Sequence, residues 1–263
     1  MRKLCLLFVI MVGFAASAFA QTQMEQADSL YALRGENFNE ATLLADSSFI
    51  NAAIDVYKEI QASATGPEKE EAAWKLMRAY YYKGRYTTND SELKKKIFNL
   101  GKEIGEEALT EFPNSPGINL FSAIVWGVWA EEYGILAAAR KGVAGKIKER
   151  CEKVIEIDPN FDDAGGYRVL GRVYFKSPKL WPILRWPSKS KAVKLLKKGL
   201  EGAPENLITK QFLAEALYSQ DEKEAAVKLM NEVLATQGIV DGIAEDTITK
   251  NEVKAILKEW EMK

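Results

Sequence analysis

Basic and aromatic side chains are grouped at two places in the sequence where they could hold an anionic ligand. One group lies between residues 75 and 83, and the other between residues 168 and 176. Arginine offers a planar fork of donors that fits a carboxylate, lysine offers a point charge, and aromatic neighbours shelter both. We expect one shared surface to carry both groups: Lys75, Tyr82, Lys83, Arg168, Arg172, Phe175 and Lys176. The alternative is that these are solvated charges on exposed helix faces.

A pair of tryptophans suggests a second kind of binding site. Trp126 and Trp129, with Tyr133 after them, recur at helical spacing in an apolar stretch. Large aromatic side chains around a cavity provide both contact area and shape for an apolar ligand. The alternative is that they fill the core between helices.

The segment 179–187 is unusually apolar for a loop. It contains Trp181, Arg185 and Trp186, and its two Trp-Pro pairs restrict the backbone. We expect it to cover the repeat core as a lid. The alternatives are that it joins a second copy of the chain in a homo-oligomer or touches a membrane surface.

The residue types that most often perform catalysis are scarce. The sequence contains no histidine, the commonest general base and metal ligand. Glu131 and Glu132 are adjacent, so a helix would point them in different directions, and Asp162 and Asp163 follow a helix end. No phosphate-binding glycine loop or nucleophile motif is present. We therefore expect a non-enzymatic protein without a metal site or a cofactor.

Charge and cysteine content narrow the choice of partners further. The 36 basic and 37 acidic residues give a formal charge of −1, which provides no reason to expect a nucleic acid partner. Of the two cysteines, Cys5 lies in an apolar N-terminal stretch. Cys151 is then left without a disulfide partner, and we interpret it as a small buried side chain.

The first twenty residues have the pattern of a cleaved secretory signal. Arg2 and Lys3 precede an apolar run, and Ala18-Phe19-Ala20 follows it. We expect a leader at residues 1–20 and one repeat domain at residues 21–263. Because Cys5 lies at the front of the leader, no lipid-anchor cysteine is expected, and the mature protein should be exported.

A helical stripe organises the middle of the chain. Tyr167, Leu170, Gly171 and Tyr174 fall at offsets of three, four and seven, so they share one helix face. Gly171 should mark a place where a second helix comes close. That partner helix carries Ala192, Leu196 and Gly199 and ends before Pro204, which cannot continue a helix.

The same pairing of helices recurs along the sequence. Gly199 and Val233 are 34 residues apart, which is the length of a tetratricopeptide unit, and the longer gaps between Pro113, Pro159 and Pro204 fit that period plus inserted loops. The pattern predicts loops at residues 84–91, 134–145 and 176–188, and a capping box at Thr249-x-x-Glu252 before a terminal helix. We expect an all-α, tetratricopeptide-like solenoid of about five helical hairpins with a C-terminal capping helix.

Several short stretches narrow the resemblance. The segments 27–34, 126–131, 165–172 and 190–197, together with the long loops, resemble the periplasmic T component (the TatT family) of TRAP-type transporters. This resemblance implies a periplasmic protein that binds a solute-binding protein, oligomerises, and helps to pass a small apolar or carboxylate ligand. The alternative is a general protein- or peptide-binding scaffold of the cell envelope.

Overall fold

The computed structural model describes residues 23–178 and 184–262. The leader predicted for residues 1–20 and the side chain of Trp181 lie outside the described residues. Within the described ranges, none of the helices combines the length and the apolar character that a membrane span needs.

The described chain is a series of helices. Residues 23–32 are helical, and an isolated antiparallel bridge joins Asn39 to Leu44. The further elements are η1 (Leu33–Gly35), α2 (Ser48–Ser63), α3 (Pro67–Tyr86), α4 (Ser91–Glu111), α5 (Pro116–Tyr133), α6 (Ile135–Arg140), α7 (Val143–Ile157), α8 (Phe161–Lys176), α9 (Lys189–Gly202), α10 (Leu207–Tyr218), α11 (Lys223–Ala235) and α12 (Ile243–Glu261).

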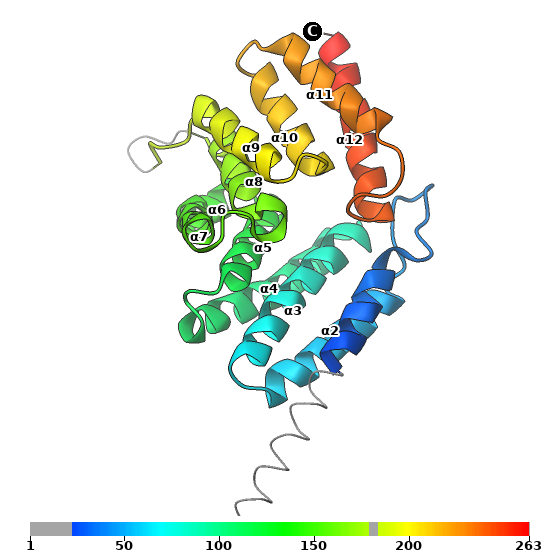
Figure 1. The fold of residues 1–263 in the computed structure, drawn as a ribbon, viewed down its shortest axis with the longest axis vertical. Helices are drawn as coiled ribbons and strands as arrows, with labels where there is room; N and C mark the ends of the chain where they lie inside the picture. Colours follow the sequence, from blue (N-terminus) through cyan, green and yellow to red (C-terminus); the bar gives the residue numbers. More distant parts are fainter. Residues whose placement is uncertain (1–22, 179–183, 263) are drawn as a thin grey trace, which may run out of the picture.

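The helices form two layers along a curved path (Figure 1). Successive helices pack side by side, from α2 against α3 to α11 against α12. In addition, α3 contacts α5, α5 contacts α8, α8 contacts α10, and α10 contacts α12, so these helices form a continuous inner layer. The outer layer consists of α2, α4, α7, α9 and α11. This arrangement confirms the predicted all-α helical solenoid.

Two packing predictions are confirmed. The apolar helix α5 is buried nearly all round, with Leu120, Ala123 and Val125 fully inaccessible to solvent. Gly171 of α8 lies against α9, where an added Cβ would stand 2.5 Å from Leu196 Cγ and 3.3 Å from its backbone nitrogen. Only a residue without a side chain fits that contact.

The predicted loop at residues 84–91 is wrong. Helix α3 continues to Tyr86 and α4 begins at Ser91, so the connection is short. Gly84 lies inside α3. A glycine is needed at this position because the ring of Phe98 occupies the space where a Cβ would be. A packing glycine was therefore mistaken for a turn residue. The region 134–145 likewise contains the short helix α6.

The predicted capping box at Thr249 is also wrong, because α12 begins at Ile243. The carboxylate of Asp246 accepts hydrogen bonds from the backbone nitrogens of Val240 (2.7 Å) and Asp241 (3.2 Å). It thus satisfies donors just before the helix that would otherwise lack a partner. Thr249 and Glu252 lie inside the helix.

Substitution of Gly171 tests the inner packing. We expect Gly171→Ala to lower the free energy of unfolding by about 1–3 kcal/mol, because the added methyl overlaps with Leu196 in a filled core. Gly145→Ala is the matched control, since it adds the same group to a helix with no atom within 4 Å, and it should be neutral or stabilising. Urea unfolding measures both, and equal effects would contradict the packing described here.

Candidate binding groove

The inner layer encloses a concave groove with a volume of about 1190 Å³. The helix at residues 23–32 and helices α3, α5, α8, α10 and α12 all contribute side chains, among them Tyr31, Ile124, Val173, Phe212 and Glu252. Parts of α6 and α7 also line it. We call this the inner groove.

The centre of the inner groove is apolar. Small and aliphatic side chains from α5, α6, α7 and α8 form a surface that we call the apolar floor: Ile124, Gly127, Val128, Ala138, Ile147 and Val173. Around Gly127 there is free space, since the nearest atom to an added Cβ is Ile147 Cδ1 at 3.9 Å. Such a surface favours ligands that bring apolar groups with them.

Both ends of the helical array meet at one side of the inner groove. Arg34 Nε donates to Glu245 Oε1 at 2.8 Å, and Arg34 Nη2 donates to the backbone oxygen of Asp241 at 2.7 Å. Arg85 Nη2 pairs with Glu252 Oε1 at 2.7 Å. We call these five residues the end clasp. In Figure 1 the start of α12 accordingly lies beside the loop that precedes α2.

The end clasp contains buried carboxylates. Burial raises the pKa of Asp241 to about 6; Arg168 opposes this rise, while Asp246 and other nearby carboxylates add to it. Burial also raises the pKa of Glu245, and the charge of Arg34 opposes that rise. Asp241 Oδ2 and Glu245 Oε2 have no hydrogen-bond partner among the described residues. Ionisation of these groups therefore depends on Arg34 and Arg168.

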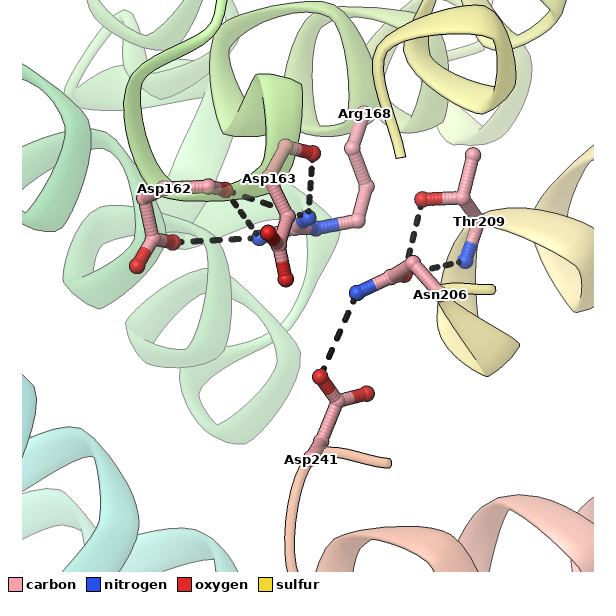
Figure 2. Close-up of polar contacts among 6 residues, drawn as sticks. All are labelled: Asp162, Asp163, Arg168, Asn206, Thr209 and Asp241. Carbon is pink, nitrogen blue, oxygen red and sulfur yellow. Dashed lines mark hydrogen bonds and ion pairs between the residues drawn. The ribbon is translucent and has the colours of Figure 1, made fainter. Parts of the chain in front are cut away.

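Asp241 also connects to the start of α10 (Figure 2). Asn206 Nδ2 donates to Asp241 Oδ1 at 3.4 Å, a long hydrogen bond. The amide oxygen of Asn206 accepts from the backbone nitrogen of Thr209 at 2.9 Å and from its hydroxyl at 2.8 Å, so Asn206 is the N-cap of α10. This hydrogen bond links the end clasp to helix α10 of the inner layer.

Arg168 holds an unusual turn at the start of α8 (Figure 2). Asp162, Asp163 and Ala164 have φ values of 50°, 56° and 54°, and a left-handed residue other than glycine costs about 1–2 kcal/mol. Arg168 donates to the backbone oxygen of Asp163 at 3.1 Å and to Asp162 Oδ2 at 3.2 Å. The guanidinium therefore offsets part of the strain in this turn.

Arg172 and Lys176 follow Arg168 at four-residue spacing on the same face of α8, and they share one carboxylate. Arg172 pairs with Glu215 at 2.8 Å and Lys176 pairs with the same residue at 3.3 Å. The Arg172 guanidinium also lies 4.0 Å from the ring centroid of Phe212. These contacts link α8 to α10, and one carboxylate between two cations leaves a net positive charge at this site.

The structure brings some of the predicted site residues together and separates others. Five of the predicted residues line the inner groove: Lys75, Arg168, Arg172, Lys176 and Trp186. Lys75 is buried in ion pairs with Asp28 (2.5 Å) and Glu71 (2.6 Å). The described residues that do not line it are Tyr82, Lys83, Trp126, Trp129, Phe175 and Arg185.

The tryptophans of α5 face α4 instead of the inner groove. Trp126 donates to Glu106 Oε1 at 2.7 Å, and Trp129 donates to Asn99 Oδ1 at 2.9 Å. Both side chains are almost fully buried. Tyr82 is buried too, and its hydroxyl donates to the backbone oxygen of Arg34 at 2.9 Å, next to the end clasp. These aromatic side chains therefore hold neighbouring elements together and do not line the inner groove.

One groove residue was missed from the sequence. Arg78 of α3 lines the inner groove, with its guanidinium carbon 4.1 Å from the ring centroid of Tyr31 and 5.1 Å from that of Trp74. In the sequence it falls at the same helical offsets as the apolar residues Trp74 and Tyr81, so the spacing does not separate it from them. A charged residue in an apolar stripe was the signal that could have identified it.

No group of three or more carboxylate or thiol side chains arranged to hold a metal ion occurs in residues 23–178 and 184–262. Cys151 is fully buried, and burial raises the pKa of its thiol. This agrees with its interpretation as a packing residue.

Comparison with known proteins assigns the family. The family model for "Regulator of microtubule dynamics protein 1-3" matches residues 24–261. The chain belongs to this family. Regulator of microtubule dynamics protein 3 of Rattus norvegicus is 30% identical over 149 residues, which cover 57% of this chain and 30% of the rat protein. Protein 2 of Bos taurus is 31% identical over 110 residues, 42% of this chain and 26% of the bovine protein. The chain thus spans under a third of these relatives.

Solved structures support the fold. A thermophilic tetratricopeptide-repeat protein of Thermus thermophilus superposes with a TM-score of 0.58 at 17% identity, covering 90% of this chain and 98% of that chain. At this level of identity the likeness concerns the fold alone.

The resemblance to the T component of TRAP-type transporters was wrong. The family that matches nearly the whole described chain is that of the regulators of microtubule dynamics and not the transporter component. The stretches that suggested it are helix-packing motifs, which unrelated helical hairpins share. The exported, periplasmic location and the transporter partner are corrected with it, because the matched relatives are proteins of mammals, whose cells have no periplasm.

Removal of Arg34 tests the end clasp. We expect Arg34→Met to lower the free energy of unfolding by about 3 kcal/mol, because it leaves the buried carboxylate of Glu245 without its partner. Lys69→Met breaks the more exposed pair with Glu111 and should cost less than about 1 kcal/mol. Adding Glu245→Met to Arg34→Met should restore part of the loss. Equal effects of Arg34→Met and Lys69→Met in urea unfolding would exclude a stabilising clasp.

Proposed function

We propose that this chain is a non-enzymatic protein-binding module that takes a segment of a partner protein into its inner groove. The observation that carries this proposal is the apolar floor, which lies inside a concave surface of about 1190 Å³. Grooves of this kind bind extended or helical segments through apolar anchors, while polar groups around them set the register.

The shape of the inner groove favours a segment over a folded domain. The inner helices curve around the floor, and the end clasp joins the first and last of them. A convex domain surface could touch only the rim of such a groove, whereas a single strand or helix can reach Ile124 and Val173. The buried thiol of Cys151 and the absence of histidine support a binding role over catalysis.

The family name supplies candidates for the partner. The relatives are named as regulators of microtubule dynamics, and this chain corresponds to under a third of their length. A repeat region of this kind would contribute recognition of another protein to such a regulator. Microtubule proteins are therefore among the partners to examine.

Filling the inner groove tests the proposal. Peptides are first selected from a random library for binding to the wild-type chain, and their affinity for the Gly127→Trp variant is then measured. This substitution places an indole over the apolar floor, where Gly127 leaves free space. We expect at least a tenfold loss of affinity, because the side chain occupies the site of the peptide.

Ala62→Trp is the matched control, since Ala62 is exposed on α2 and does not line the inner groove. It should leave the affinity unchanged, and thermal unfolding checks that both variants are folded. If no peptide is enriched, or if Gly127→Trp binds the selected peptides as tightly as the wild type, the proposal is wrong. Binding of apolar small molecules to the inner groove without binding of any peptide would also contradict it.

A further inference from the structure

Arg78 differs from the other cations of the inner groove. Among the described residues, every other lysine or arginine of the groove lining has a carboxylate within ion-pair distance. The pairs are Arg34 with Glu245, Lys75 with Asp28 and Glu71, Arg85 with Glu252, Arg168 with Asp162, and both Arg172 and Lys176 with Glu215. No described carboxylate forms such a pair with Arg78, so its charge remains available to a ligand.

The surroundings of Arg78 hold its guanidinium in place without neutralising it. The group lies over the rings of Tyr31 and Trp74, and its charge lowers the pKa of the nearby Tyr57 hydroxyl against the larger effect of burial. That hydroxyl gives its own proton to Asp28 Oδ1 at 2.6 Å. The neighbours of Arg78 are therefore aromatic faces and a neutral hydroxyl.

The carboxylate of Asp28 is fully engaged elsewhere. One oxygen accepts from Tyr57, and the other lies 2.5 Å from Lys75 Nζ. Arg78 Nε is buried and has no hydrogen-bond partner among the described residues. A cation that has no carboxylate partner and lies in a partly desolvated site binds an anion more strongly than it would in water.

We propose that Arg78 is the anion-recognising residue of the inner groove and that it binds an acidic side chain of the partner segment. The inference rests on the proposed function, and it adds the chemistry of the ligand. Because Nε is buried, the incoming carboxylate meets the terminal Nη groups, and apolar neighbours in the same segment lie on the apolar floor. The stacked rings keep the guanidinium ordered, so little entropy is lost on binding.

A double-mutant cycle tests this assignment. The probes are the peptides selected with the wild-type chain, each also made with its glutamate or aspartate replaced by the amide. We expect acidic peptides to be enriched, and Arg78→Gln to weaken them about tenfold or more. The amide peptides should bind the wild type about tenfold more weakly and should be insensitive to Arg78→Gln, because the charge pair is already absent.

Lys69→Gln is the matched control, since Lys69 lies on the same helix but outside the inner groove, and it should change nothing. Arg78→Lys should fall between the wild type and Arg78→Gln, because it keeps the charge but loses the planar fork. Because Arg78→Gln loses the stacking on Tyr31 and Trp74 but breaks no ion pair, its melting temperature should fall by about 2–4 °C and the variant should stay folded. If Arg78→Gln does not fold, the comparison of acidic and amide peptides on the wild-type chain still tests the proposal.

The outcomes separate the two proposals. If no peptides are selected, the proposed function fails. If peptides bind and are blocked by Gly127→Trp, but amide and acidic forms bind equally well or Arg78→Gln weakens both alike, only the role of Arg78 is overturned.

Discussion

The ion pair between Arg34 and Glu245 is the contact on which the shape of this molecule depends. It joins residues 211 positions apart in the sequence, and the same arginine holds the backbone oxygen of Asp241. An array of stacked helix pairs has contacts only between neighbours, so nothing else in its design requires the first and last helices to meet. With Arg34 in place the solenoid encloses a groove; without it we expect a buried carboxylate left unpaired and an array that opens more readily, with only Arg85 and Glu252 of the clasp still paired.

Most of the charge around the inner groove is used to maintain that shape. Arg168 offsets the strain of the left-handed turn at Asp162 and Asp163, and Glu215 forms ion pairs with both Arg172 and Lys176. What remains for recognition is the apolar floor and very few polar groups. Selectivity therefore depends on isolated side chains such as Arg78 and not on a broad basic surface, which is how many peptide-binding grooves combine apolar anchors with a single charged contact.

The sequence predicts the local part of this structure well. The stripe through Leu170 and Gly171 and the all-round apolar character of α5 depend on helical periodicity, which acts over a few residues. Prediction from the sequence fails where contacts with residues far away in the chain determine the structure. Gly84 is explained by Phe98, the start of α12 by Asp246, and the position of the Arg78 guanidinium by the rings of Tyr31 and Trp74. The transporter resemblance failed for a related reason, since packing motifs identify helical hairpins and not the partner they bind.

The distance between the two ends of the helical array tests the central claim most directly. Spin labels on Glu36→Cys and Ile239→Cys, both at exposed positions beside the end clasp, report that distance in solution. A closed array predicts one short, narrow distribution in the wild-type background and a longer, broader one when Arg34→Met is added. A broad distribution in the wild-type background, or one that Arg34→Met leaves unchanged, would contradict the account.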